Sequence, residues 1–319
     1  MKTYGSQLQL ISLVLTLLFS INLPDAAANP ARLGKNASLG GRVPFPADNP
    51  WNTDISAEPV DSNSDRLIAS IGLSTGLHPD FGTVWEGAPI GIPYMVVGRK
   101  QKKVPVSFYY ASESNRTKYP IPSNAPIEGG AASDGDRHIL IIDRDAWKLY
   151  ELFDARLVRG RWRAGSGAVF NLKSNTLRPA GWTSADAAGL PIFPGLVRYD
   201  EVVRLGKIEH ALRFTVQRTR RAYVHPARHF ASSSGDVNLA PMGMRVRLKA
   251  NFDIGGYSPH VRVILTAMKK YGMFVADNGS NWYVSGAPDR RWNDEELSAL
   301  RNVKGRDFEV VQMGEVVTE

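Results

Sequence analysis

DGDRHILIIDRDAWKLYELFD, residues 134–154, is the stretch of the sequence that decides the fold class. Residues 139–142 are almost wholly apolar, which is typical of a strand buried on both faces. Residues 147–153 form a second run with strand character, and the segment Arg144-Asp145-Ala146 separates the two runs. The pattern therefore predicts a β-hairpin at the centre of a mainly β protein.

The length of the hairpin loop decides which side chains face each other across the two strands. With a three-residue loop, Glu151 lies opposite Ile139. With a four-residue loop, His138 lies opposite Phe153 instead. The sequence leaves both registers open.

The rest of the chain favours the same class. The chain has 319 residues, of which 43% are hydrophobic and 22% are charged, as in ordinary globular proteins. Its 29 glycines and 20 prolines recur at short intervals, which favours many short strands joined by turns. We predict one antiparallel β-sandwich of jelly-roll type, with peripheral helices over residues 259–271 and 294–301. Ser258 as N-cap and Pro259 at the first helical position mark the start of the first helix.

The N-terminus has the pattern of a secretory signal peptide. A basic residue precedes an apolar run over residues 8–21, and small residues ending at Ala28 fit a cleavage site. The run is too short and too poorly flanked to be a membrane span. We predict a signal peptide over residues 1–28, a flexible leader over 29–42 and one β-rich domain over 43–319. The mature protein is then secreted, periplasmic or extracellular, without an integral membrane span.

Charge and cysteine content narrow the classes of partner and chemistry. The chain contains no cysteine, which excludes disulfides, thiol nucleophiles and cysteine-based zinc sites. Its formal net charge is +8 at pH 7, which favours a polysaccharide or another anionic extracellular polymer as partner. A solvated basic surface is the simpler alternative. The same alternatives apply to the basic loop 98–103, and we expect no nucleic-acid partner.

Two further strand regions carry charged side chains. Residues 208–216 alternate, which places His210 on an apolar face and Arg213 on the opposite face. Residues 273–285 contain the Asn-Gly pair typical of a tight turn, which predicts a second hairpin. Asp277 is then most simply a turn residue.

Paired carboxyl groups are the chemistry that these acids suggest. Acid–base cleavage of a glycosidic bond needs two carboxyl groups across a cleft. Asp136, Glu151 and Asp186 are the catalytic candidates, because the first hairpin brings the first two within reach of each other. We therefore interpret the chain as a polysaccharide-active protein, and most simply as a glycoside hydrolase. A structural role, such as a turn cap or an edge salt bridge, is the alternative for each acid.

Histidine occurs beside arginine or an acid at three predicted strand starts. If those strands are neighbours, the imidazoles share one rim, where they bind or orient the substrate. The substrate-binding candidates are His138, His210, Arg228, His229 and Trp182. The spacing of His225 and His229 matches that of a zincin, but Pro226 and the lack of a following glutamate are incompatible with a helix-borne metal site. We assign no metal and no cofactor.

Two other functions fit the same residues. A polysaccharide lyase uses arginine to neutralise a uronate and histidine or tyrosine as base and acid. A non-catalytic carbohydrate-binding or surface protein uses exposed aromatics, for which Trp51, Trp182 and Trp282 are candidates. For Trp51, a plug over the core is the preferred interpretation.

Several segments together resemble a known family. They include GDRHILIIDRDAWKLYELFDA, SADAAGLP, HALRFTV, ARHFASSS and YGMFVADNG. Over residues 45–311 the chain is similar to a family of secreted, largely bacterial proteins of uncharacterised activity. The resemblance implies a common fold and an extracellular location, and no catalytic residue is carried over from it.

Overall fold

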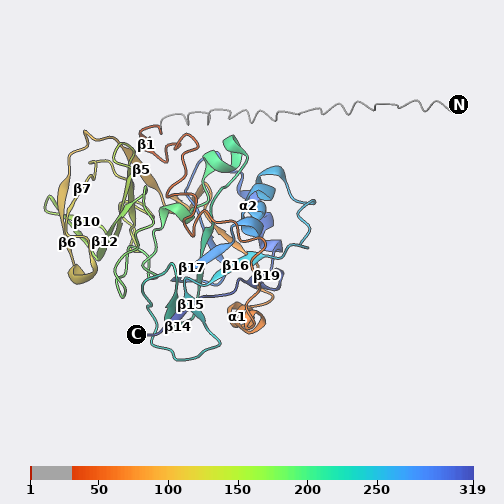
Figure 1. The fold of residues 1–319 in the computed structure, drawn as a ribbon. Coiled ribbons are helices and arrows are strands. Elements are labelled where there is room, and N and C mark those ends of the chain that lie inside the picture. Colours follow the sequence, from red (N-terminus) through yellow and green to blue (C-terminus); the bar gives the residue numbers. More distant parts are fainter. Residues whose placement is uncertain (2–30) are drawn as a thin grey trace.

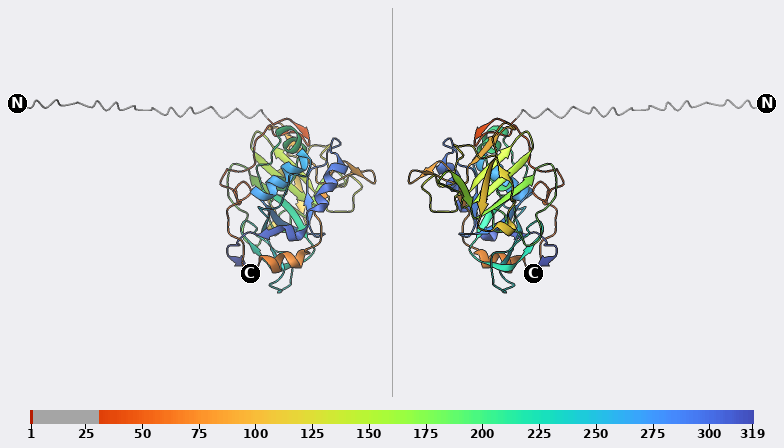
Figure 2. Two further views of the ribbon diagram at one scale, coloured as in Figure 1. Left: turned by 90° about the vertical axis from the view of Figure 1, so that its right-hand side faces the viewer. Right: turned by 90° about the vertical axis from the view of Figure 1, so that its left-hand side faces the viewer.

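The computed structural model describes Met1 and residues 31–319, so the predicted signal peptide lies outside the described residues except for Met1. Strands outnumber helices throughout this part of the chain, and the predicted mainly β class is confirmed. Two groups of strands lie side by side in Figure 1, with β5, β6, β7, β10 and β12 on the left and β16, β17 and β19 beside helix α2 on the right. Figure 2 shows α1 at the same end of the molecule as the C-terminus.

The predicted central hairpin is the middle of a five-stranded sheet. Ile139 pairs with Leu152 and Asp143 pairs with Lys148, so the loop has four residues and His138 lies opposite Phe153. All five residues of the first strand are buried, as its apolar sequence predicts. In spatial order the strands are β1 (Gly34–Lys35), β5 (Tyr94–Val97), β8 (Ile139–Asp143), β9 (Lys148–Phe153) and β12 (Ser166–Asn171).

A four-stranded sheet covers one face of this central sheet. Leu140 and Ile142 of β8 face one apolar cluster, and Ile139 and Ile141 face another, to which Trp162 contributes from the covering sheet. The central hairpin is therefore sandwiched between two cores. In spatial order the covering strands are β10 (Arg156–Val158), β11 (Arg161–Ala164), β6 (Val104–Phe108) and β7 (Lys118–Tyr119).

A six-stranded sheet organises the other half of the chain around the largest apolar cluster. Its strands, in spatial order, are β19 (Phe308–Val310), β16 (Arg245–Leu248), β17 (Met273–Asn278), β13 (Leu212–Val216), β18 (Tyr283–Ser285) and β2 (His78–Asp80). The predicted hairpin over residues 273–285 is wrong, because β13 lies between β17 and β18 and pairs with both. The Asn-Gly segment carries the chain past the end of β13 instead.

The sheets are mixed rather than purely antiparallel, which corrects the predicted antiparallel jelly-roll. Parallel pairs join β5 to β8, β6 to β11, β13 to β17, β14 to β15 and β2 to β18. Parallel pairing needs long crossover connections, which turn signals alone do not predict. Two small sheets complete the set, one of β15 (Ala240–Met242), β14 (Thr219–Val224) and β20 (Val316–Val317), and one of β3 (Val84–Trp85) and β4 (Ala88–Pro89).

The helices are short and peripheral. Ser258 caps α2 by accepting a hydrogen bond from the amide of Val261, as its position before Pro259 predicts. The second predicted helix is shorter than expected and continues as a 3-10 helix. The α-helices are α1 (Ser64–Ile71), α2 (Pro259–Lys270) and α3 (Asp294–Ser298); the 3-10 helices are η1 (Ala111–Glu113), η2 (Phe193–Gly195), η4 (Ala299–Asn302) and η5 (Gly305–Asp307); η3 (Asp200–Leu205) is a π-helix. No helix within residues 31–319 has the length and apolarity that crossing a bilayer requires.

The described part of the predicted flexible leader is held by the fold. Gly34 and Lys35 pair with β5, and Ala31 and Leu39 are buried in the apolar cluster on that side of the sheet. Asn36 also receives a hydrogen bond from the amide of Tyr94. The small and polar composition of this segment suggested flexibility, but its few apolar side chains are enough to dock it on the sheet edge.

Candidate active site

An open cavity of about 380 Å³ lies where the two halves of the molecule meet, with acidic side chains around it. Four carboxyl groups line it: Glu113, Asp136, Asp186 and Asp277. His229 is the one basic side chain among the described residues that line it. Two of these residues, Asp136 and Asp186, belong to the predicted catalytic set.

Asp186 is held in a buried ion pair with Arg213. The guanidinium binds both carboxylate oxygens, with Nη2 at 2.8 Å from Oδ1 and Nε at 3.1 Å from Oδ2. Arg213 also donates to the hydroxyl of Ser285, so its donors face fixed partners. Burial lowers the pKa of Arg213, but the negative charge of Asp186 outweighs this and raises that pKa further above its ordinary value. The bidentate geometry keeps this pair charged.

Asp277 lies beside Asp186 in the lining of the cavity, and the interaction between the two carboxyl groups raises the pKa of Asp277 and opposes the rise in that of Asp186. Burial, together with the charge of Asp186, raises the pKa of Asp277 to about 7, although Arg213 opposes the shift. Because both oxygens of Asp186 are bound by Arg213, Asp277 is the acid of the pair that is better placed to hold a proton. A carboxylic acid that is protonated near neutral pH is suited to general acid catalysis.

A β-bulge aims Asp277 at the cavity. Val275 pairs with Phe214 and Asp277 pairs with Thr215, so Ala276 is an extra residue in β17. A bulge of this kind re-aims the side chain that follows it and is common beside active sites. Sequence reasoning missed Asp277, although an acid directly after the buried apolar run 273–276 is a signal that could have found it.

Asp136 stands at the exposed rim of the same cavity. Its carbonyl accepts a hydrogen bond from the amide of Asp154 at 2.8 Å, which ties the segment to the end of β9. The buried Arg137 adds hydrogen bonds to the carbonyls of Ala131 and Ser133. Partial burial raises the pKa of Asp136, and the charge of Asp277 raises it further, while His138 opposes the shift. Asp136 is thus a second carboxyl group that faces the cavity and is free of an ion pair within the described residues.

Glu113 and His229 form the opposite wall. His229 Nδ1 lies 2.7 Å from the carbonyl of Ala187, which makes Nδ1 the protonated nitrogen and turns Nε2 toward Glu113, 4.0 Å away. Glu113 also accepts a hydrogen bond from the amide of Thr183 at 3.1 Å. The prediction that His229 faces the site agrees with its position, whereas Glu113 was not predicted.

His138 lies beneath the cavity and does not line it. Its side chain is 3% exposed, with Nδ1 at 2.6 Å from Glu128 and Nε2 at 2.9 Å from the carbonyl of Ala185. Burial alone would lower the pKa of His138, but the charge and hydrogen bond of Glu128 raise it to about 9. The predicted role in substrate binding is corrected: the imidazolium holds the residue that precedes Asp186 and is a positioning group.

His210 lies in a different buried cluster. It is 1% exposed, its Nδ1 is 2.8 Å from the carbonyl of Ala211, and its Nε2 is 3.1 Å from Glu201. Glu201 also forms an ion pair with Arg198. The three predicted imidazoles therefore do not share one rim, and the substrate-binding role of His210 is also corrected.

The predicted catalytic role of Glu151 is corrected, because its side chain is 0% exposed and does not line the cavity. It accepts hydrogen bonds from the amides of Ile192 at 3.0 Å and Phe193 at 2.9 Å. Burial raises its pKa to about 7, although these two amides oppose the shift. Its role is to fix the first turn of η2 against the central sheet.

The remaining predicted residues make contacts within the protein and do not face the cavity. Arg228 donates to the carbonyl of Arg178 at 2.9 Å, and the Arg178 guanidinium lies over the Trp182 ring at 5.6 Å. Neither Arg228 nor Trp182 lines the cavity. Trp51 is buried against Phe274, which confirms the predicted plug.

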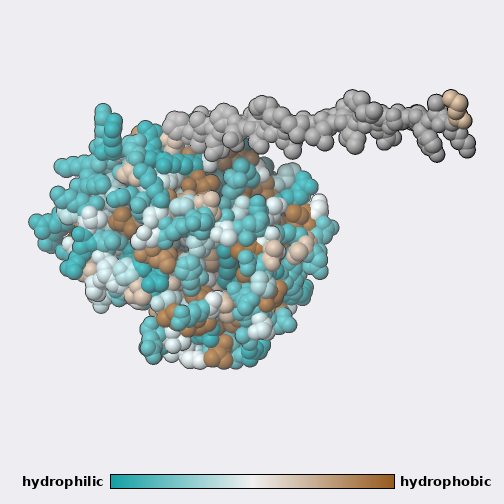
Figure 3. All heavy atoms as spheres, viewed as in Figure 1, coloured by the Kyte–Doolittle hydropathy of each residue, from teal (hydrophilic) through white to brown (hydrophobic). Residues whose placement is uncertain are grey.

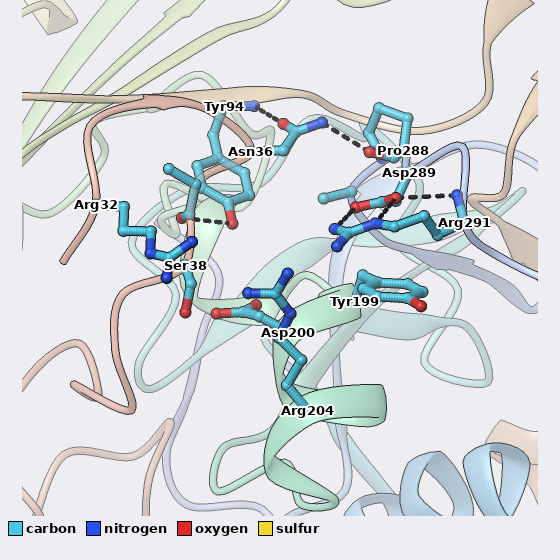
Figure 4. A pocket seen from close by; sticks show the side chains of 12 residues that line it. Arg32, Asn36, Ser38, Tyr94, Tyr199, Asp200, Arg204, Pro288, Asp289 and Arg291 are labelled. Atoms are coloured by element: carbon cyan, nitrogen blue, oxygen red, sulfur yellow. Dashed lines mark hydrogen bonds and ion pairs between the residues drawn. The ribbon is translucent and has the colours of Figure 1, made fainter. Parts of the chain in front are cut away.

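A smaller cavity of about 160 Å³ lies between the β1 segment and η3, and Figure 4 shows its side chains. One of its two acids, Asp289, is paired with Arg291, which stacks over the Tyr199 ring at 4.1 Å. Hydrogen bonds from Arg291 outweigh burial and lower the pKa of Asp289. An acid held charged in this way has no proton to donate at neutral pH, which distinguishes Asp289 from Asp277.

Within residues 31–319, no three His, Cys, Asp or Glu side chains are arranged to hold a metal ion. Comparison with protein-family models, with curated proteins and with solved structures finds no match to this chain. The functional conclusion therefore rests on the geometry of the acidic cavity.

Proposed function

We propose that this protein is a hydrolase of glycosidic bonds in an extracellular polysaccharide, with Asp277 as the general acid. The single observation that carries the proposal is the pair of carboxyl groups, Asp277 and Asp186, that line one cavity while Arg213 binds both oxygens of Asp186. Glycoside hydrolysis requires a carboxylic acid whose pKa is raised, so that it is still protonated when the substrate binds.

The second carboxyl group is best supplied by Asp136. Asp186 cannot serve, because both of its oxygens are bound by Arg213 and its contact with Asp277 is closer than the roughly 5 Å that separates the carboxyls of retaining enzymes. Asp136 faces the same cavity from another strand end. Asp277 donates its proton to the glycosidic oxygen as the bond to that oxygen breaks. The Asp136 carboxylate then either attacks the sugar carbon or takes a proton from the water that attacks it.

The composition of the cavity favours hydrolysis over β-elimination. A lyase needs a cation beside the uronate carboxylate of its substrate. Arg213 is committed to Asp186, and His229 is the one basic side chain that the described residues contribute to the lining. Asp186 is neutralised by Arg213 and Asp277 carries a proton in the proposed mechanism, so Asp136 and Glu113 are the acids of the cavity that repel a uronate.

The proposed location is outside the cytoplasm. The signal-peptide pattern of residues 1–28 and the resemblance to a family of secreted proteins support this part of the proposal. The positive net charge of +8 supports an anionic polymer as the partner.

The test is the release of reducing ends from a panel of neutral and acidic glycans by the purified mature protein. We expect activity on at least one glycan and a loss of about 10²–10⁴-fold in Asp277→Asn, the range for removing a general acid. Asp289→Asn is the matched control, since it removes an acid from the smaller cavity, and it should retain activity. New absorbance of unsaturated uronate would show a lyase instead. Binding without cleavage on the whole panel would show a carbohydrate-binding protein.

A further inference from the structure

The four-stranded sheet has an outer face rich in basic side chains. Arg161 and Arg163 alternate with Trp162 along β11, so both arginines point outward while Trp162 packs on the core. Arg156 of β10 pairs with Arg163, and Lys118 of β7 is exposed on the same face. In Figure 3 the outer edge of the molecule on the side of these strands is mostly hydrophilic.

The spacing of these charges follows from strand geometry. Side chains two residues apart in one strand are about 7 Å apart, and neighbouring strands are about 5 Å apart. The register places Arg163 beside Ser107 of β6, and Pro105 of β6 beside Lys118. The face therefore presents cations at intervals comparable with the length of one sugar unit.

Few acids neutralise this face. Arg156 pairs with Asp154 at 2.7 Å. Within the described residues, Arg161, Arg163 and Lys118 have no carboxylate within ion-pair distance. Like charges on neighbouring strands destabilise a sheet, so these side chains do not serve the fold. A negatively charged partner would remove the repulsion.

The face leads to the acidic cavity. Strands β6 and β11 are parallel, and the chain passes from β11 through Gly165 to Ser166, which lines the cavity. The chain passes from β6 to Tyr109, which is 82% exposed, and Tyr110, which is 47% exposed and also lines the cavity. Tyr109 follows the outward alternation of Pro105 and Ser107, so it extends the basic face toward the cavity.

We infer that Arg156, Arg161, Arg163, Lys118 and Tyr109, here called the basic face, bind an extended carboxylated polysaccharide whose chain continues into the acidic cavity. The Asp136 and Glu113 carboxylates of the cavity repel an acidic sugar, whereas the basic face attracts one. The substrate is therefore a polymer with acidic units on the basic face and a non-acidic unit at the cleaved bond. The binding part stands on the basic face alone, and the statement about the cleaved unit rests on the proposed function.

A polysaccharide fits this arrangement better than a nucleic acid. Every nucleotide carries a phosphate, so a nucleic acid that followed the basic face to the cavity would bring phosphates against the Asp136 and Glu113 carboxylates. A mixed polysaccharide places its charges only on some units. Tyr109 offers an exposed ring on which a sugar stacks.

The experiment measures binding and cleavage separately. Binding is measured for hyaluronan, which alternates acidic and non-acidic units, for polygalacturonate, in which every unit is acidic, for neutral dextran and for single-stranded DNA. The protein is the full mature chain carrying Asp277→Asn, so that turnover does not interfere. The test variant adds Arg161→Glu and Arg163→Glu. The charge-matched control adds Lys100→Glu and Lys102→Glu in the basic loop 98–103.

We expect both acidic polymers to bind, dextran to bind at least tenfold more weakly, and the arginine reversals to lower affinity for the acidic polymers at least tenfold. The lysine reversals should change that affinity less than threefold. Equal losses in both variants, or a larger loss with the lysines, would overturn the basic face as the binding site. Tighter binding of single-stranded DNA than of either acidic polymer would overturn the choice of partner.

Cleavage with the wild-type active site tests the statement about the cleaved unit. Among the acidic polymers, hyaluronan and related mixed polymers are the expected substrates, and polygalacturonate should bind without being cut. Cleavage of polygalacturonate would overturn the statement. If binding follows the arginines and no glycan on the panel is cut, the basic face stands and the proposed hydrolase fails.

Discussion

Two clusters of charged side chains in the described part of the chain each combine acids with an arginine, yet only the first contributes to the acidic cavity. The first contains Asp186, Asp277 and Arg213. It has two acids for one base, so one acid holds a proton at neutral pH. The bulge in β17 turns that acid toward the cavity.

The second cluster contains Glu201, Arg198 and His210 and has one acid for two basic side chains. Burial alone would raise the pKa of Glu201, but Arg198 and His210 together lower it below its ordinary value. Glu201 is therefore an anion that holds η3 and the start of β13 together. The first cluster differs from the second in its excess of acid and in its access to a cavity. These two properties, and not the types of side chain, give the first cluster its chemistry.

Replacing one acid in each cluster separates the two roles most strongly. Asp277→Asn should lower turnover of a cleaved glycan about 10²–10⁴-fold, because it removes the donated proton. Glu201→Gln should leave turnover per folded molecule within about twofold, the scatter expected when no group facing the substrate changes. The measurement is the initial rate of reducing-end release, normalised to the folded fraction by circular dichroism. Equal losses of turnover in the two variants would remove the distinction between the clusters.

The free energy of unfolding should depend more on the second cluster than on the first. Glu201→Ala leaves Arg198 buried without its partner, which costs about 3–5 kcal/mol of unfolding free energy. Asp277→Asn keeps a hydrogen-bonding group of the same shape beside Asp186 and should cost less than about 1 kcal/mol at pH 6. Urea unfolding at that pH measures both changes. A larger loss in Asp277→Asn than in Glu201→Ala would contradict the assignment of roles.

The pH dependence of stability gives a smaller effect with a defined sign. The folded pKa of Asp277, about 7, lies above the value of about 3.9 for an unfolded aspartate. Between these values the folded protein binds a proton that the unfolded chain does not, so the contribution of this group falls as pH rises from about 4 to about 7. Unfolding free energies are measured at pH 5 and pH 8. Between these two pH values the wild type should lose about 2–4 kcal/mol more unfolding free energy than Asp277→Asn does, by the same linkage. An identical loss in both proteins would mean that Asp277 titrates normally.

Trp182 should give the smallest effect. Its ring contacts Arg178 and does not line the cavity, so Trp182→Ala should leave the KM of a cleaved glycan within about twofold. The lost cation–π contact should cost about 0.5–2 kcal/mol of stability. Steady-state kinetics with urea unfolding measure both quantities. A tenfold rise in KM would restore Trp182 as a substrate-binding residue.

Local patterns predicted the parts of the fold that depend on neighbouring residues. The apolar run 139–142 predicted a strand buried on both faces, and Ser258 with Pro259 predicted the start of α2. The register of the hairpin needed the structure, because both loop lengths satisfy the same alternation. Parallel pairs such as β13 with β17 depend on segments about 60 residues apart, and no turn signal encodes them.

The candidate site was predicted only in part for the same reason. The sequence predicts Asp136 because it lies beside the recognisable hairpin, and Asp186 as a further candidate acid. The Asn-Gly pattern predicts a turn role for Asp277, because its true role depends on the insertion of β13 between β17 and β18. The sequence predicts Glu151 as a candidate because the hairpin places it within reach of Asp136. The alternation of polar and apolar residues in its strand does not reveal that Glu151 is completely buried.

The titration of Asp277 tests the central claim most directly and needs no substrate. The carboxyl carbons of aspartate are labelled with ¹³C in the wild type and in Asp277→Asn, and their chemical shifts are followed from pH 3 to pH 9. We predict one resonance with a midpoint at about pH 7 that is missing from Asp277→Asn. If every aspartate resonance that Asp277→Asn removes titrates below about pH 5, Asp277 is an ordinary ionised carboxylate and the proposed general acid is contradicted.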